Sequence, residues 1–180
     1  QFLRYLLDVA APQHGFEEVT LARYLRLQPP SRQTAIREKT SWSCPHGVVR
    51  WHGSCGCVPG DGSWKYHLRQ ALNELASRVD LIYGTETGLL LRDSLAALDD
   101  YLALRLGLLT HEDFWAKHAA TLPSPQQEER ILRLLEMMYF RHLMFTSCAF
   151  FFEDLDRMEP RNNIAYAANV IRLAGELFRG

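Results

Sequence analysis

The stretch SPQQEERILRLLEMMYFRHLMFTSCAFFF, Ser124–Phe152, carries the clearest helix signal in the chain. Ser124 can cap a helix, Pro125 suits its first turn, and Gln127 can complete a capping box with Ser124. The residues that follow on one helical face are Ile131, Leu135, Met138, His142, Phe145, Ala149 and Phe152. Towards its end the stretch is apolar nearly all round, which predicts a helix over 124–152 at the buried centre of a bundle.

Helical periodicity continues on both sides of this stretch and predicts an all-α fold. The expected helices cover residues 2–10, 16–27, 64–82, 94–106, 110–115 and 160–178. Between the second and third helices the periodicity disappears, and glycines, cysteines and tryptophans accumulate. We therefore expect an irregular bundle of about six or seven helices with one long ordered loop over about 31–62.

Two of these helices have an apolar side that should face the core. On the helix that Asp93 can cap, the expected buried residues are Leu95, Leu98, Leu102 and Leu106. On the last helix, which Pro160 should begin, they are Ile164, Ala168, Ile171 and Phe178.

The composition fits a single helical domain over residues 1–180. The chain is 47% hydrophobic with a formal net charge of −1, which gives no electrostatic reason to expect nucleic acid or a membrane as a partner. Its longest strongly apolar run, Leu143–Phe152, is about half the length that spans a bilayer. The start at Gln1 suggests a fragment of a longer protein. Four cysteines, three of them crowded together, favour a reducing cytoplasm over a disulfide framework.

The loop TSWSCPHGVVRWHGSCGC, Thr40–Cys57, contains a possible metal site. Cys44, His46, Cys55 and Cys57 offer four ligands of the kinds that zinc prefers. Only one residue separates the members of each pair, however, whereas common zinc motifs place two or more residues between paired cysteines. We therefore expect no cofactor and interpret the thiols as small packing groups, with zinc held by these four residues as the alternative.

The same region is rich in tryptophan. Trp42, Trp51 and Trp64 lie in or beside the glycine-rich loop, where an indole offers a flat apolar face and one N–H donor. These rings either stack on a sugar, with hydroxyl partners His46, His52 and Arg50, or anchor the loop to the bundle. The sequence does not choose between the two readings.

A second unusual stretch is TSCAFFFEDLD, Thr146–Asp156. Glu153, Asp154 and Asp156 fall where a helix should end, and negative charge is unfavourable there. One interpretation gives them Arg157 and Arg161 as partners, with Asp156 or Glu159 capping the last helix. The other is a polar site, to which Thr146 and Ser147 would add hydroxyl groups.

These motifs resemble those of a known family. They are TSWSCPHGVVRW followed by CGC, W-x-x-x-LR-x-AL at Trp64–Leu72, TSCAFFFEDLDRMEP, and IAYAANVIRLA. They look like domain of unknown function 3536, a helical domain found downstream of the catalytic domain in proteins similar to glycoside hydrolase family 57. The resemblance covers nearly the whole chain, beginning at FLRYLLDVAAP.

The resemblance implies an accessory role in a carbohydrate-active protein. Family 57 enzymes are retaining hydrolases and transferases of α-glucans, and their paired carboxylates sit on an incomplete barrel. Both carboxylates would lie upstream of Gln1, so this chain would lack catalytic residues and would line the cleft of that barrel. The expected contacts to an oligosaccharide or α-glucan are Trp42, His46, Arg50, Trp51, Trp64, Thr146 and Asp154. The alternative function is a zinc-stabilised helical module that binds a protein partner.

Overall fold

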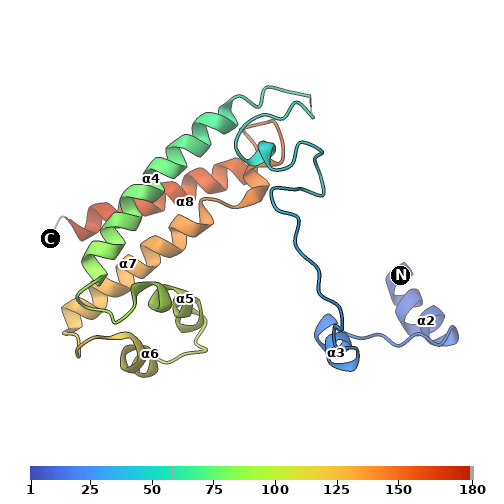
Figure 1. Cartoon of the computed structure of the whole chain (residues 1–180), viewed down its shortest axis with the longest axis horizontal. Coiled ribbons are helices and arrows are strands. Elements are labelled where there is room, and N and C mark those ends of the chain that lie inside the picture. The colour runs from blue at the N-terminus through green and yellow to red at the C-terminus, as the bar shows by residue number, and fades with distance from the viewer. Residues whose placement is uncertain (58, 179–180) are drawn as a thin grey trace. The chain divides into compact units, whose positions relative to one another are not determined.

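The computed structural model describes residues 1–57 and 59–178 (Figure 1). Its described residues form helices and loops without a named strand, and a single antiparallel bridge joins Leu91 to Ala119. The expected all-α fold is therefore confirmed. The chain divides into two compact units, Gln1–Glu38 and a larger one that begins at Lys39. In the described part of the chain, no helix is both long and apolar enough to cross a bilayer.

The first unit consists of short helices. Its N-terminal helical segment runs through α1 (Phe2–Tyr5), the π-helical η1 (Leu6–Ala10) and α2 (Ala11–Gln13). The helix expected over 16–27 is shorter, because α3 covers only Leu21–Leu27. Thr20 sets its start, since its hydroxyl accepts a hydrogen bond from the Arg23 backbone N–H at 3.2 Å.

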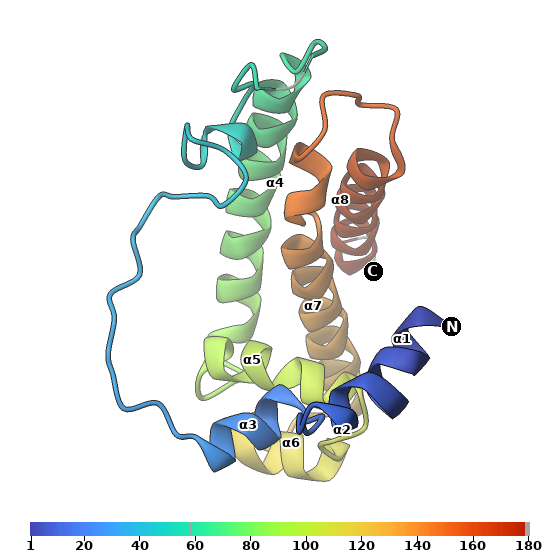
Figure 2. The same ribbon diagram turned by 90° about the vertical axis from the view of Figure 1, so that its right-hand side faces the viewer.

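The second unit is built around three long helices that run side by side. They are α4 (Trp64–Thr87), α7 (Pro125–Leu143) and α8 (Met158–Leu177), as Figures 1 and 2 show. The shorter α5 (Ser94–Arg105) and α6 (His111–His118) close the end of the bundle where α4 ends and α7 begins. The short 3₁₀ turns η2 (Val49–Trp51) and η3 (Ser147–Phe150) lie at the other end.

Helix α7 is the centre of this bundle, as its sequence predicts. Ser124 and Gln127 form the expected capping box: the Gln127 backbone N–H donates to Ser124 Oγ at 3.3 Å, and the Ser124 backbone N–H donates to Gln127 Oε1 at 2.8 Å. It packs against α4 and α8. Its buried side chains are Ile131, Leu134, Leu135, Met137 and Met138. Burial of this apolar face supplies most of the driving force for packing the helix.

The helix expected over 124–152 ends early, at Leu143. Thr146 leaves the helical conformation, with φ −56° and ψ 128°, and η3 follows. The fully buried Asn163 of α8 provides the reason: its amide nitrogen donates to the Thr146 carbonyl at 3.0 Å, and its amide oxygen accepts from the Thr146 hydroxyl. These tertiary hydrogen bonds replace those that a continued helix would make.

The buried face expected for α5 is wrong in part. Leu95, Leu102 and Leu106 are exposed and only Leu98 packs against the core, while the buried residues are Ala97, Tyr101 and Leu104. Leucines occupy both faces of this helix, so periodicity alone does not identify the inner one. The Asp93 cap is confirmed by hydrogen bonds from the backbone N–H groups of Leu95 and Ala96.

The last helix also differs from expectation. It begins at Met158, two residues before Pro160, and leaves Ile164, Ala168 and Ile171 exposed. Phe178, which directly follows its last residue, is exposed too. Its buried stripe is Pro160, Asn163, Val170, Leu173 and Leu177. The stripe is displaced by one position because its first turns carry a polar residue, Asn163, whose partner lies on another element.

Candidate metal centre

The cysteine-rich loop lies against the end of the bundle formed by η3 and the start of α4 (Figure 1). Three hydrogen bonds from side chains to backbone carbonyls hold it there. Arg50 donates to the Phe151 carbonyl at 3.1 Å, and the indole of Trp51 donates to the Ser147 carbonyl at 3.2 Å. Arg69 of α4 in turn donates to the Trp51 carbonyl at 3.3 Å. The loop is thus fixed both to α4 and to the segment that contains η3.

Within this loop the structure gathers Cys44, His46, Cys55 and Cys57 into one cluster. Their candidate ligand atoms all lie within 4.8 Å of one another. Cys44 Sγ is 3.6 Å from both Cys57 Sγ and His46 Nδ1, and His46 Nδ1 is 3.1 Å from Cys57 Sγ. Cys44 is buried, whereas Cys57 is exposed, so the three thiols are not simply packing groups of the core.

The spacing of these atoms is close to that of a tetrahedral zinc site. Zinc binds thiolate sulfur at about 2.3 Å and imidazole nitrogen at about 2.0–2.1 Å, which places two sulfurs about 3.8 Å apart and sulfur and nitrogen about 3.6 Å apart. Among Cys44, His46 and Cys57, two of the three separations agree closely with these values, and the 3.1 Å between His46 Nδ1 and Cys57 Sγ is shorter. With Cys55 included, the four atoms lie within 4.8 Å of one another, close enough for one ion to draw them together. A Cys₃His set is one of the established structural zinc sets. The cluster can therefore hold zinc, as the alternative interpretation proposed.

Left-handed glycines shape the backbone at both ligand pairs, between the two residues of one pair and directly after the other. Gly56, between Cys55 and Cys57, has φ +70°, and Gly47, directly after His46, has φ +65°. Left-handed backbone of this kind reverses the chain sharply and strongly favours glycine. At Gly47 a Cβ atom would also lie 2.4 Å from the Lys39 carbonyl oxygen. The usual spacing rule does not apply here because the backbone between the ligands is not extended.

The thiols strongly affect one another's charge. Burial raises the pKa of Cys55, but hydrogen bonds from the Cys57 backbone N–H, from Arg50 and from the neighbouring thiols outweigh it and lower the pKa to about 6. A hydrogen bond with Cys44, together with burial and nearby negative charge, raises the pKa of Cys57 to about 11. Cys55 therefore loses its proton readily, and the negative charge of the cluster makes loss of a second proton, from Cys57, unfavourable. A bound divalent cation would remove this repulsion between thiolates.

Arg50 supplies positive charge directly behind the cluster. Its side chain is buried, and its hydrogen bond to Cys55 and the surrounding thiols raise the pKa of its guanidinium despite desolvation. The guanidinium also stacks on the Phe151 ring, 4.9 Å from the centroid. Three thiolates around zinc carry a net negative charge, so Arg50 is suited to neutralise it and to orient Cys55.

The structure gives the three loop tryptophans different environments. Trp42 is 94% exposed and stacks on Phe151 with ring centroids 6.5 Å apart. Trp51 and Trp64 instead have their N–H groups bonded to backbone carbonyls, Trp64 to that of Glu153 at 2.8 Å. Of the three, Trp42 is the one that presents a flat apolar surface to solvent.

The acidic stretch after η3 obtains a partner that the sequence did not indicate. Glu153 forms an ion pair with Lys65, the second residue of α4, with Nζ and Oε1 2.8 Å apart. Arg157 pairs with Glu159 instead, so it does not compensate Glu153. The sequence does not indicate this role for Lys65, because a lysine in the first turn of an amphipathic helix is usually exposed to solvent.

The remaining residues expected to contact sugar do not form one site: Thr146 bonds to α8, whereas Asp154 lies at a separate pocket. Thr146 is bonded to Asn163, and the exposed Asp154 accepts a hydrogen bond from the Asp156 backbone at 2.9 Å. Trp64 and Asp154 line a pocket of about 500 Å³, together with Asp61 and Arg157 among others. Trp42, His46, Arg50, Trp51 and Thr146 are not among the residues that line that pocket.

Comparison with known proteins identifies the family to which the helical bundle belongs. Residues 61–180 match the family described as "Domain of unknown function (DUF3536)", so the chain belongs to that family. The match begins just before α4 and leaves the Cys44–Cys57 cluster outside it. No curated protein and no solved structure matches the chain.

Proposed function

We propose that this chain is a zinc-stabilised helical module, in which one ion holds the loop against the end of the bundle. The convergence of Cys44, His46, Cys55 and Cys57 within 4.8 Å carries this proposal. The metal supplies a structural crosslink: it joins the two ligand pairs, keeps Arg50 and Trp51 on η3, and fixes the backbone that presents Trp42. The rigid loop then serves as a contact surface for a partner.

Zinc content of the purified chain tests the proposal. We expect about one equivalent of zinc after expression in zinc-supplemented medium, measured by inductively coupled plasma mass spectrometry. His46→Ala and Cys57→Ser should lose it. His52→Ala and Cys148→Ser provide matched controls, since neither residue belongs to the cluster, and both should retain the metal. Sub-stoichiometric zinc in the wild type, or full zinc in Cys57→Ser, would contradict the proposal.

A second candidate function is the accessory role in a carbohydrate-active protein that the sequence resemblance implies. The exposed ring of Trp42, supported from behind by Phe151, favours it, because sugars bind well to flat aromatic surfaces that are held in place. In this role the chain lines the α-glucan cleft of an upstream barrel of the family 57 type and supplies no catalytic carboxylate. The barrel and the glucan would be its partners.

The reading frame upstream of Gln1 is the first test of this role, because it must encode such a barrel. In that longer protein, Trp42→Ala should weaken binding of soluble amylose in affinity electrophoresis while leaving the fold intact. Tyr66→Ala, which removes another exposed aromatic ring, should leave binding unchanged. An upstream frame without a barrel, or normal amylose binding by Trp42→Ala, would favour a protein partner.

A further inference from the structure

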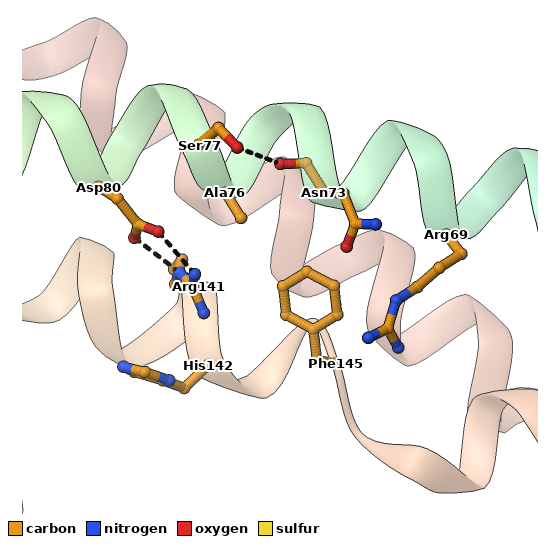
Figure 3. A pocket seen from close by; sticks show the side chains of 8 residues that line it. All are labelled: Arg69, Asn73, Ala76, Ser77, Asp80, Arg141, His142 and Phe145. Atoms are coloured by element: carbon orange, nitrogen blue, oxygen red, sulfur yellow. Dashed lines mark hydrogen bonds and ion pairs between the residues drawn. The ribbon is translucent and has the colours of Figure 1, made fainter. Parts of the chain in front are cut away.

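A polar pocket of about 380 Å³ lies between α4 and α7, apart from the metal cluster (Figure 3). Arg69, Asn73, Ser77 and Asp80 reach it from α4. Arg141, His142 and Phe145 reach it from α7 and the turn after it. Its volume is in the range of small-molecule sites.

Phe145 forms the centre of this pocket, with one arginine on each side. The guanidinium carbons of Arg69 and Arg141 lie 4.9 Å and 5.5 Å from its ring centroid. In Figure 3 the Phe145 ring lies between the side chains of Arg69 and Arg141, and the Asn73 amide projects from α4 on the same side as Arg69. An apolar ring flanked by donors suits a ligand that has both a charged end and a carbon skeleton.

The two arginines differ in how their charge is compensated. Arg141 binds Asp80 through two parallel hydrogen bonds, of 2.8 Å and 2.7 Å, which neutralise both groups. Arg69 forms no ion pair with a carboxylate in the described part of the chain. Its guanidinium donates there to the backbone carbonyl of Trp51 and stacks on the rings of Phe145 and Phe150. Its Nε atom is buried without a hydrogen-bond partner among those residues. Partial burial lowers the pKa of Arg69, and the unpartnered Nε donor leaves room for an acceptor that a ligand can supply.

The other polar groups of the pocket are also available. No hydrogen bond involves the Asn73 amide or the His142 ring among residues 1–57 and 59–178. Burial, followed by the charge of Arg141, lowers the pKa of His142 against the opposing effects of Asp80 and Asp99. The neutral imidazole therefore offers one donor and one acceptor beside the arginine.

We propose that this pocket binds a small organic anion, whose carboxylate or phosphate group is held by the Arg69 guanidinium and the Asn73 amide while its carbon atoms lie against Phe145. Arginine binds both oxyanions through its planar fork of donors. The site goes beyond the metal-stabilised role, and none of its lining residues is a candidate metal ligand.

Isothermal titration of the purified chain with phosphate and, separately, with succinate tests this site, with ionic strength held constant by sodium chloride. We expect saturable binding of at least one of the two. Binding of phosphate alone assigns a phosphorylated ligand, binding of succinate alone assigns a carboxylate, and binding of both assigns a general oxyanion site. Binding of neither would overturn the proposal.

Two variants keep the test specific. Arg69→Gln should weaken binding about tenfold or more, because it removes a charge-assisted interaction. Arg78→Gln is the control, since Arg78 lies on the same helix but is exposed and outside the pocket. Asn73→Asp, one turn from Arg69, should abolish anion binding and raise the melting temperature by supplying the missing carboxylate. Unchanged binding in either pocket variant would refute the site.

Discussion

Lys65 and Glu153 form an ion pair that is wholly enclosed by the protein, with side-chain exposures of 0% and 3%. The pair joins the first turn of α4 to the segment after η3, which are 88 residues apart in sequence. Because water does not reach either group, each depends on the other for its charge to be tolerated.

Breaking this pair should destabilise the protein strongly. Lys65→Met or Glu153→Gln leaves one buried group unpaired, which costs about 3–5 kcal/mol in the free energy of unfolding. The double variant should recover part of that loss, since no lone charge remains. Urea denaturation of the four proteins measures the coupling. The exposed pair Arg78–Glu74 is the control, and breaking it should change stability by less than about 1 kcal/mol.

Gly62 should not tolerate a side chain. A Cβ atom there would lie 1.9 Å from Glu153 Oε2, so Gly62→Ala would displace the buried carboxylate and lower the melting temperature. Gly84→Ala should have the opposite effect: nothing lies within 4 Å of its Cβ position inside α4, and alanine stabilises a helix interior by roughly 0.5–1 kcal/mol. Thermal melts of the two variants should move in opposite directions, and a stable Gly62→Ala protein would show that Glu153 is not confined as described.

Removal of zinc should loosen the loop more than the bundle. After chelation, amide hydrogen exchange over residues 44–57 should accelerate, while the amides of α7 stay protected by the core. Cys57→Ser should show the fast exchange even with added zinc, and Cys148→Ser should behave as the wild type. Equal acceleration in α7 and the loop would mean that the metal supports the whole fold.

Arg50 should influence the metal without binding it. Replacing it by methionine removes the buried positive charge behind Cys55 and the hydrogen bond to Phe151. Changes of this kind typically lower metal affinity by about 10–100-fold. Competition with a chromophoric chelator measures the effect, and the exposed Arg161 gives a matched control when it is changed to methionine. Wild-type affinity in Arg50→Met would remove Arg50 from the metal centre.

Two tryptophans should differ sharply when only their N–H group is lost. Trp64→Phe leaves the Glu153 carbonyl without its donor and should cost about 1–3 kcal/mol in the free energy of unfolding. Trp42→Phe should change stability by no more than about 0.5 kcal/mol, because the ring is almost fully exposed. Denaturant titration of both variants checks this, and a large loss in Trp42→Phe would make that ring an anchor.

The parts of the fold that could be predicted are those that local chemistry determines. The caps at Ser124 and Asp93 each depend on residues two or three positions away, and both were found where the sequence placed them. The early end of α7 and the buried face of α8 depend instead on the contact between Thr146 and Asn163, which no local pattern reveals.

The candidate site was predictable in composition but not in geometry. The four ligand types were visible in the sequence, yet their spacing argued against zinc until Gly56 was seen in a left-handed conformation. Lys65 had no signal at all, because its partner Glu153 belongs to a distant segment. The residues expected to contact sugar remain a prediction.

All four candidate ligands lie within Cys44–Cys57, so the candidate metal centre is one contiguous cassette of the sequence. The main hydrophobic core is assembled from buried residues that begin at Leu72 and end at Leu177, downstream of that cassette. Substitutions confined to the four ligands can therefore remove the metal chemistry while the helices keep their packing. The family match, which starts at residue 61, likewise covers the helical bundle and none of these four ligands.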